Sequence, residues 1–455
     1  MRREMLRDYE QSAANAARKI YMVKDGALAQ SVAPETLKAL AALNGFAGEA
    51  GAVLAGEDGV LFGVGGGTDA LVTAAAASAL PEADYVLAED LADDRASLAC
   101  LGWLIGGYRF ARYKTQKPAP ARLIAPANAD IAAARRAAGA SAMVRDLVNT
   151  PACDMTPAAL EAEAAALASR FDADFSCVVG DDLLTENFPM IHAVGRAAAV
   201  APRLIDLRWG PEDAPKLTLA GKGVCFDSGG LNIKGAAGMA LMKKDMGGAA
   251  HALALARMIM EAGLNVRLRV LIPAVENAIS GDAFRPGDIL KSRKGLTVEI
   301  GNTDAEGRLV LGDALALGAE ENPDLMISLA TLTGAARVAL GPELAPFYCD
   351  DENLAASLQA SAARVADPVW RMPLWRNYDA MLASSVADVN HISGGAFAGS
   401  ITAALFLRRF APEERPWMHF DIYAWRPKAE PGRPVGGEAQ AIRALFETLA
   451  ARYGA

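Results

Sequence analysis

The chain has 455 residues, of which 52% are hydrophobic and 22% charged, a composition typical of a folded globular protein that excludes disorder. Its 45 basic and 54 acidic residues give a formal net charge of −9, which argues against a general binder of nucleic-acid backbones. The 5 cysteines are scattered without a CxxC pair, which excludes a zinc ribbon and fits a reducing compartment.

The N-terminus is not a signal peptide, because charges recur in MRREMLRDYEQ and no apolar stretch follows. The longest uncharged stretch runs from Val389 to Leu407 and contains several polar side chains and glycines. A membrane span would not carry that polar load. We therefore expect a cytoplasmic protein without membrane contact.

The first third of the chain is rich in alanine. Helices are predicted over Leu71–Leu80 and Asp130–Met143, and a strand over Gly59–Gly63. The segment Tyr113–Arg122 is polar and contains prolines, so it is predicted to be a linker or an exposed loop. The glycine run Gly63–Gly67 lacks the GxxxxGK[ST] context of a phosphate-binding loop and is interpreted as an ordinary loop.

After about residue 140 the pattern changes to short apolar strands that alternate with helices. The predicted strands are Leu217–Leu219, Val224–Phe226, Val266–Ile272, Leu296–Ile300, Leu325–Leu329 and Phe420–Tyr423, and the predicted helices are Met246–Glu261 and Arg308–Glu320. This alternation predicts an α/β fold with a mostly parallel central sheet and helices on both faces. We also expect a smaller N-terminal α/β domain with its linker over residues 1–140. Reactive side chains are expected just after the strands, at their carboxyl ends.

Two segments that follow predicted strands, Gly221–Gly248 and Asn302–Leu311, carry four acidic residues: Asp227, Asp245, Asp304 and Glu306. An extended chain would point Asp304 and Glu306 to one side, because they are two residues apart. Four carboxylates repel one another unless cations neutralise them, and they suit a pair of divalent ions such as Mg²⁺, Mn²⁺ or Zn²⁺. The alternative is that each acid caps a helix and that Lys222, Lys234 and Arg308 are ordinary ion-pair partners.

Other catalytic patterns are weak. The four histidines (His192, His251, His391 and His419) form no HExxH spacing, which disfavours a histidine-based zinc protease. They are interpreted as core or surface residues. Ser228 lies in DSGG rather than in GxSxG, and Cys225 lies in an apolar run typical of a buried side chain.

The segment NTDAEGRLVLGDAL, from Asn302 to Leu315, resembles the signature of the leucyl aminopeptidase (cytosol aminopeptidase) family. GKGVCFDSGGLNIK and MKKDMGGAA are similar to the metal-binding segments of that family, and RDLVNTPACDMTP, RPGD and ATLTGA match it as well. The resemblance runs from about Met143 to the C-terminus. It implies a small N-terminal α/β domain, a larger catalytic α/β domain over residues 141–455, and a homohexamer.

The resemblance also implies a site. Two divalent metal ions per subunit, Mn²⁺ or Zn²⁺, would be held at positions that match Lys222, Asp227, Asp245, Asp304 and Glu306, with Asp227 and Glu306 bridging both. Lys234 and Arg308 match the catalytic positions: Lys234 would polarise the peptide carbonyl, and Arg308 would hold a bicarbonate that acts as general base. The substrate-binding positions match Met242, Thr331, Leu332 and Gly334.

The implied reaction is hydrolysis of the first residue from peptides with a free N-terminus by a metal-activated water. The chain departs from the family pattern at Gly238–Ala240, where the family usually has Asn-Met-Asp. It departs again at Tyr423 and Ala424, where Ala-Gly usually follows Asp-Ile. Both stretches lie near the side-chain pocket of the family, so we expect a first-residue preference other than leucine.

Two other functions remain open. One is a different di-metal hydrolase such as a phosphatase, because paired carboxylates also serve phosphoryl transfer. The other is a hexameric DNA-binding or architectural protein, which the net charge disfavours.

Overall fold

The computed structural model describes residues 5–116, 121–430 and 432–454. The chain forms two compact units: residues 1–142, 364–366 and 426–435 make up the first, and residues 143–363, 367–425 and 436–455 the second. Residues 117–120 of the predicted linker lie outside the described residues. Within the described part of the chain, no helix is both long and apolar enough to cross a membrane.

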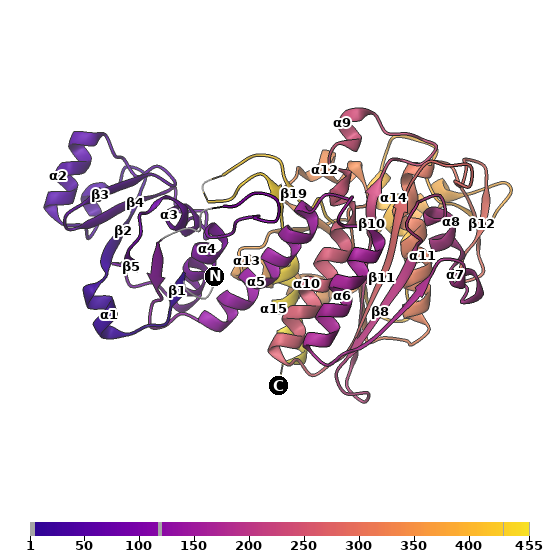
Figure 1. Cartoon of the computed structure of the whole chain (residues 1–455), viewed down its shortest axis with the longest axis horizontal. Coiled ribbons are helices and arrows are strands. Elements are labelled where there is room, and N and C mark those ends of the chain that lie inside the picture. Colours follow the sequence, from indigo (N-terminus) through magenta and orange to yellow (C-terminus); the bar gives the residue numbers. More distant parts are fainter. Residues whose placement is uncertain (1–4, 117–120, 431, 455) are drawn as a thin grey trace. The chain divides into compact units, whose positions relative to one another are not determined.

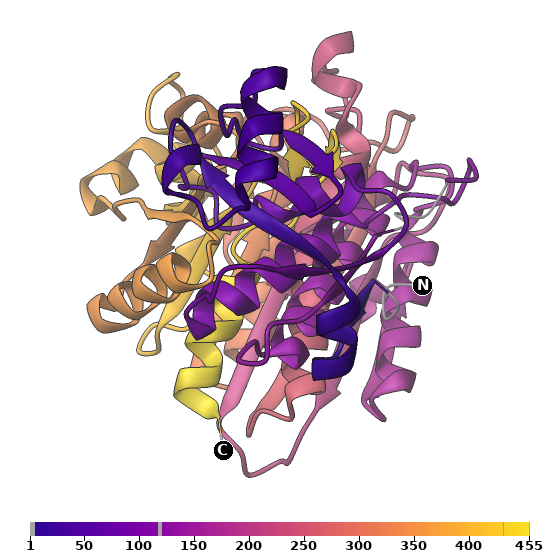
Figure 2. The same ribbon diagram turned by 90° about the vertical axis from the view of Figure 1, so that its left-hand side faces the viewer.

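The first unit is built on a six-stranded sheet with the strand order β1-β6-β5-β2-β4-β3 (Figure 1 and Figure 2). Its strands are β1 (Leu6–Arg7), β2 (Arg18–Lys24), β3 (Val53–Gly56), β4 (Gly59–Gly65), β5 (Asp84–Leu87) and β6 (Arg122–Ile124). Neighbouring strands are parallel except for the antiparallel hairpin of β3 and β4. Its helices are α1 (Gln11–Ala16), α2 (Glu35–Asn44), α3 (Thr73–Ala79) and α4 (Asp93–Gly106), and α5 (Ile131–Asn149) follows β6.

The alanine bias of the first third has a packing reason in α3 and α4. A Cβ atom on Gly106 would lie 2.1 Å from the carbonyl oxygen of Ala74, and one on Gly102 would lie 2.3 Å from Thr73 Oγ1. The Thr73 hydroxyl donates a hydrogen bond of 2.7 Å to the carbonyl of Ala99. Small residues on both helices therefore allow their backbones to come into close contact.

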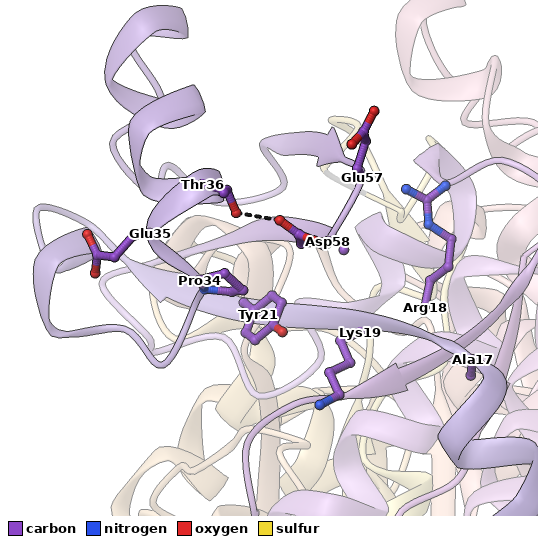
Figure 3. A pocket seen from close by; sticks show the side chains of 10 residues that line it. Ala17, Arg18, Lys19, Tyr21, Pro34, Glu35, Thr36, Glu57 and Asp58 are labelled. Atoms are coloured by element: carbon purple, nitrogen blue, oxygen red, sulfur yellow. Dashed lines mark hydrogen bonds between the residues drawn. The ribbon is translucent and has the colours of Figure 1, made fainter.

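The first unit also contains an open hollow of about 610 Å³ at the ends of β2 and α2 (Figure 3). Arg18, Lys19, Glu35 and Asp58 are among the residues that line it, and Thr36 donates a hydrogen bond to Asp58. Because both cations and carboxylates line it, the hollow favours no single class of ligand.

The second unit contains a nine-stranded sheet with the order β16-β15-β18-β14-β9-β11-β8-β7, in which β10 also pairs with β11. Its strands are β7 (Asp174–Val179), β8 (Arg203–Trp209), β9 (Lys216–Gly221), β10 (Gly223–Asp227), β11 (Arg267–Asn277), β14 (Leu325–Ala330), β15 (Ala345–Cys349), β16 (Val369–Arg371) and β18 (Trp417–Asp421). The central strands β18, β14, β9, β11 and β10 are parallel, and antiparallel pairs occur toward both edges. The carboxyl ends of the central strands therefore meet at one edge of the sheet.

Helices cover both faces of this sheet, as predicted (Figure 1). One face carries α6 (Pro157–Arg170), α10 (Gly247–Ala262) and α15 (Ile442–Tyr453), and the other carries α8 (Pro189–Gly195), α11 (Glu306–Ala319) and α14 (Gly399–Arg408). The remaining helices are α7 (Asp182–Thr185), α9 (Ala236–Met239), α12 (Gly334–Leu340) and α13 (Glu352–Arg364). A small sheet joins β12 (Ile289–Lys291), β13 (Thr297–Glu299) and β17 (Val389–Asn390), and β19 (Trp425–Arg426) pairs with β20 (Gly436–Gly437). The predicted α/β class is confirmed.

Several predicted boundaries are wrong. The helix predicted to end at Met143 continues to Asn149, the strand predicted to end at Ile272 continues to Asn277, and the glycine run predicted to be a loop begins inside β4, which ends at Gly65. The late strand begins at Trp417 and ends at Asp421, and Ala424 after it adopts a left-handed φ of 57° that leaves the sheet. The polar segment predicted to end at Arg122 instead enters β6 at that residue, because Arg122 pairs with Asp84 of β5.

Candidate active site

The carboxylates singled out in the sequence lie together at the carboxyl edge of the central strands. Asp227 ends β10, Asp245 lies in the 3₁₀ turn η2 (Met242–Met246) that precedes α10, and Glu306 is the first residue of α11. One oxygen atom from each of these three residues lies within 4.8 Å of the other two, and all three residues are buried. The structure thus assembles residues that are up to 79 positions apart in the chain into one acidic cluster.

Two lysines hold this cluster in place. Lys222, between β9 and β10, places its Nζ 2.6 Å from Asp245 Oδ2 and 2.9 Å from Glu306 Oε1. Lys234 Nζ lies 2.7 Å from Asp227 Oδ2 and also pairs with Asp304 Oδ1. Asp304 therefore joins the other acids through Lys234, and it is the most exposed of the four carboxylates.

Neither Asp304 nor Asp245 acts as the helix cap that the alternative interpretation required. Asn302 provides the cap at the 3₁₀ turn η3 (Thr303–Ala305), where its side chain accepts a hydrogen bond from the Asp304 N–H. Asp245 lies inside η2, and its Oδ1 accepts the hydroxyl of Thr331 at 2.8 Å. The expected extended chain between Asp304 and Glu306 is wrong, because this segment is the turn that enters α11.

Burial and mutual repulsion alter the proton affinity of the acids. Burial raises the pKa of Asp227 to about 6, and the nearby Asp245 adds to that rise. Burial likewise raises the pKa of Glu306 to about 7, with Asp227 contributing. Burial also acts to raise the pKa of Asp245, but Lys222 and Lys244 outweigh it and hold that pKa below its ordinary value. The cluster therefore concentrates negative charge that the protein alone does not fully compensate.

The negative charge of the carboxylates keeps both Lys222 and Lys234 protonated. Burial lowers the pKa of Lys222, but Asp245 and Glu306 more than reverse the effect, so this pKa is raised. The pKa of Lys234 is raised for the same reason, with Asp227 as its main partner against the effect of burial. A metal ion at Lys222 would therefore have to displace a proton from the amine.

Glycine and asparagine residues that the sequence reasoning did not single out shape the cluster. A Cβ atom on Gly307 would lie 2.5 Å from Cε and 2.8 Å from Nζ of Lys222, so only glycine leaves room for this side chain. Asn277, the last residue of β11, donates a hydrogen bond of 2.8 Å to Asp227 Oδ1. Asn277 could not be found from the sequence, because its place beside Asp227 depends on the pairing of β10 with β11.

Arg308 lies in the first turn of α11, next to this cluster. Its Nη1 donates a hydrogen bond of 2.7 Å to the carbonyl of His391, and within the described residues its buried Nε has no hydrogen-bond partner. Burial lowers the pKa of Arg308 to about 10, against the opposing effect of Asp421 and Glu306. The guanidinium thus remains a cation that can bind an anion.

The histidines do not join the carboxylates. His251, His391 and His419 are fully buried, and burial lowers the pKa of His251 to about 4 and of the other two to about 3. His192 instead contacts Asp181 at 3.1 Å. These observations agree with the interpretation of the histidines as core or surface residues.

Three of the predicted substrate-binding positions lie in the loop that follows β14 or directly after it, and the fourth lies in η2. Thr331 and Leu332 lie in this loop, Gly334 begins α12, and Met242 begins η2. The buried Asp421, at the end of β18, accepts the N–H groups of Leu332 and Thr333 through one oxygen atom, and the hydroxyls of Thr333 and Ser400 through the other. Asp421 is therefore a loop-positioning residue that the motif alone did not reveal.

The cluster fits a divalent cation. Four carboxylates face two ammonium groups, so negative charge is in excess. The Nζ of Lys222 contacts both the buried Asp245 Oδ2 and the buried Glu306 Oε1, and within the described residues neither oxygen atom has a further hydrogen-bond partner. Oxygen donors of this kind suit hard or borderline ions such as Mg²⁺, Mn²⁺ and Zn²⁺.

Comparison with known proteins agrees with this geometry. The profile described as "Cytosol aminopeptidase family, catalytic domain" matches residues 142–446, and "M17 aminopeptidase, N-terminal domain" matches residues 26–126. The chain belongs to the cytosol aminopeptidase family. This membership confirms the family resemblance found in the sequence and identifies the chain as an aminopeptidase, a hydrolase of peptides.

Individual members of the cytosol aminopeptidase family are similar over most of the chain. The probable cytosol aminopeptidase of Roseiflexus castenholzii is 41% identical over 384 residues, which are 80% of this chain and 78% of that protein. The crystal structure of a cytosol aminopeptidase from Coxiella burnetii matches with a TM-score of 0.92 and 42% identity, over 99% of both chains. The bottromycin maturation enzyme BotP in complex with Mn matches with a TM-score of 0.84 and 32% identity, again over 99% of both chains.

Proposed function

We propose that this aminopeptidase uses two divalent metal ions to remove the first residue from peptides that carry a free N-terminus. The observation that carries the proposal is the buried cluster of Asp227, Asp245 and Glu306 around Lys222, at the carboxyl edge of a parallel sheet. Lys222, Asp227, Asp245, Asp304 and Glu306 would hold the ions, which we propose to be Mn²⁺ or Zn²⁺. The Mn in the BotP complex supports this choice for a related protein.

When bound, a pair of divalent ions supplies Lewis acidity toward a carbonyl and activates water near neutral pH. The protein's own part begins with Lys234, whose Nζ is fixed between Asp227 and Asp304. Its raised pKa keeps this ammonium group charged, so it can donate a hydrogen bond to the oxygen of the scissile carbonyl. A fixed cation at that place stabilises the negative charge that develops as the carbonyl is attacked.

Arg308 would provide an anion site beside the acids. Its guanidinium is buried, and it is oriented by the bond to the carbonyl of His391. We propose that it holds bicarbonate, and that general-base chemistry comes from this anion because no histidine reaches the cluster. The free α-amine of the substrate would be recognised at the metal site that the four acids hold, which would restrict cleavage to the first residue.

The assembly and location of the enzyme are part of the proposal. We propose a homohexamer in the cytoplasm that acts on peptides, without a membrane or nucleic acid as partner. The names of relatives as probable cytosol aminopeptidases support the proposed location, and the net charge of −9 argues against nucleic acid as a partner.

The test is metal-dependent hydrolysis of aminoacyl amides. After a chelator has removed the metal, the protein should be inactive. Calorimetry should then show that each chain binds two Mn²⁺ or Zn²⁺ ions. Metal should restore hydrolysis of Ala-amide, whereas N-acetylated Ala-amide should remain uncleaved. Full activity of the demetallated protein would contradict the two-metal mechanism, and equal cleavage of the acetylated substrate would contradict exopeptidase action. Release of phosphate from phosphomonoesters in place of amino acids would favour the phosphatase alternative.

A further inference from the structure

Two cations beside the acidic cluster lack an acidic partner. Lys244 precedes Asp245 in η2 and is 2% exposed, and Arg337 lies partly buried in α12. In the described part of the chain, no carboxylate oxygen lies within 4.0 Å of the side-chain nitrogen atoms of either residue. A buried cation such as Lys244 is costly without a close counter-ion, and the positive charge of the partly buried Arg337 adds to that cost.

Both cations contact the same aromatic ring. Lys244 Nζ lies 5.2 Å from the centre of the Tyr423 ring, and Arg337 Cζ lies 4.6 Å from it. A ring face attracts a cation, but it has no net charge and cannot neutralise two. Tyr423 is partly exposed, so the place where the two charges converge can be reached by a ligand.

The nearest acids are already occupied by other donors. Asp245 is paired with Lys222 and accepts the hydroxyl of Thr331. Asp421 accepts two backbone N–H groups and two hydroxyls. Neither acid therefore forms a close ion pair with Lys244 or Arg337, and Asp245 and Asp421 act on the charge of Lys244 only over a longer distance.

These cations lie next to the acidic cluster and next to the positions that are predicted to bind substrate. Lys244 is adjacent in sequence to Asp245, one of the acids of the cluster. The Arg337 guanidinium approaches to 3.6 Å the position that a Cβ atom on Gly334 would occupy, and Gly334 directly follows the loop that contacts Asp245 through Thr331. A substrate whose α-amine binds at the cluster extends its first side chain into these immediate surroundings.

We propose that Lys244 and Arg337 form, with the Tyr423 ring, a subsite for the side-chain carboxylate of an acidic first residue. The proposal rests on the proposed aminopeptidase function and names its substrate class. Charge-assisted hydrogen bonds from an ammonium and a guanidinium group favour a carboxylate over the isosteric amide.

The experiment compares Asp-amide with Asn-amide, because the two differ in charge but hardly in shape. We expect kcat/KM to favour Asp by about 10- to 100-fold, the effect of a hydrogen bond to a charged group. Lys244→Gln and, separately, Arg337→Gln should bring this ratio toward one while Ala-amide is still cleaved. Arg337 lies on a partly exposed helix, so its variant tests the idea even where Lys244→Gln fails to fold.

Lys243 offers a matched control. It is the preceding lysine and also faces a ring, with Nζ 5.6 Å from the centre of Trp425, but it donates a hydrogen bond of 2.7 Å to the carbonyl of Asn149. Lys243→Gln should leave the ratio of Asp-amide to Asn-amide unchanged.

The outcomes separate the two proposals. An Asp/Asn ratio near one in the unmodified enzyme, with Ala-amide cleaved, overturns the carboxylate subsite and leaves the aminopeptidase mechanism intact. Equal losses on all substrates in the variants also overturn it. If dipeptides outperform dipeptide amides in a way that depends on Arg337, the cations bind a C-terminal carboxylate instead, and the side-chain proposal is wrong. Failure to cleave any of the amides contradicts both proposals.

Discussion

Lys222 is the residue on which the acidic cluster depends most directly. Its ammonium group contacts Asp245 and Glu306 and also donates a hydrogen bond of 3.1 Å to the carbonyl of Thr331. Three separate segments of the chain therefore meet at one nitrogen atom. The Lys222 side chain can reach this place only because residue 307 is a glycine, which has no side chain.

The Gly307→Ala variant tests this packing. In an exposed helix this change would stabilise by up to about 1 kcal/mol, but here the new methyl group meets Lys222. We expect the free energy of unfolding of the metal-free protein to fall by about 1–3 kcal/mol, the usual cost of overpacking. Urea unfolding measures this change, and calorimetry should show weaker metal binding.

The Lys222→Ala background provides the control for Gly307→Ala. With the long side chain removed, the added methyl group should cost little or even stabilise the helix, so the two changes should not be additive. The same destabilisation of Gly307→Ala in both backgrounds would show that the contact with Lys222 is not its cause.

At the scale of elements, the ends of parallel strands organise the site. The loop between β14 and α12 carries two of the predicted substrate-binding positions, Thr331 and Leu332, and the neighbouring strand β18 holds that loop through Asp421. Burial raises the pKa of Asp421, while the donated hydrogen bonds, led by the hydroxyl of Thr333, counteract the rise. A buried carboxylate that accepts four hydrogen bonds fixes backbone geometry more firmly than the loop could alone.

The Asp421→Asn variant should disturb this loop without removing a metal position. The amide keeps one oxygen atom for the N–H groups of Leu332 and Thr333, but it places an NH2 donor where the hydroxyls of Thr333 and Ser400 donate, so both hydroxyls must reorient and the loop at Thr333 should shift. A displacement of this kind costs about 10²-fold in kcat/KM, because the substrate loses its productive alignment. Steady-state kinetics should show this loss, and metal analysis should show unchanged metal content.

Asp367→Asn is the matched control for Asp421→Asn. Asp367 is also buried and also accepts backbone N–H groups, from Ala441, Arg443 and Ala444 at the start of α15. Its variant should lower stability and leave kcat/KM unchanged. A similar kinetic loss in both variants would mean that Asp421 acts on general stability rather than on the loop.

At the scale of the whole molecule, buried titratable groups make stability depend on pH in opposite directions. His251 is neutral in the fold, because burial lowers its pKa from 6.5 to about 4. Asp313 is a buried acid whose pKa burial raises from 3.8 to about 7, although it accepts the N–H groups of Met190, Ile191 and Arg293. The folded state thus binds fewer protons than the unfolded state at His251 and more at Asp313.

The sign of each contribution follows from these shifts. Stability due to His251 is present above pH 6.5 and is lost as the pH falls toward about 4, at up to about 1.4 kcal/mol per pH unit. Stability due to Asp313 is present below pH 3.8 and is lost as the pH rises toward about 7. In urea unfolding at pH 5, 6 and 7, His251→Gln should therefore reduce the gain in stability with rising pH, and Asp313→Asn should increase it. Parallel curves for both variants and the unmodified protein would contradict the assignment of these two groups.

The sequence alone was sufficient for the fold class, because its signals are local. Alternating apolar strands and helices after residue 140 predicted the parallel sheet with helices on both faces, and the segments around Asp227 and Asp304 identified the family. The four acids could be selected as candidates because each follows a strand or begins a helix. The ends of strands and helices can be predicted from neighbouring residues in the chain, without knowledge of contacts between distant residues.

Only the tertiary structure decided how those candidates meet. The sequence did not show that Lys222 lies between Asp245 and Glu306, that Gly307 makes room for it, or that Asp421 holds the loop after β14. It suggested an extended segment at Asp304, where the chain in fact turns into α11. The sequence likewise could not predict that Lys244 and Arg337 both contact Tyr423, because these residues lie in η2, in α12 and in the segment after β18. These contacts depend on strand order and register, which bring together residues that are far apart in the chain.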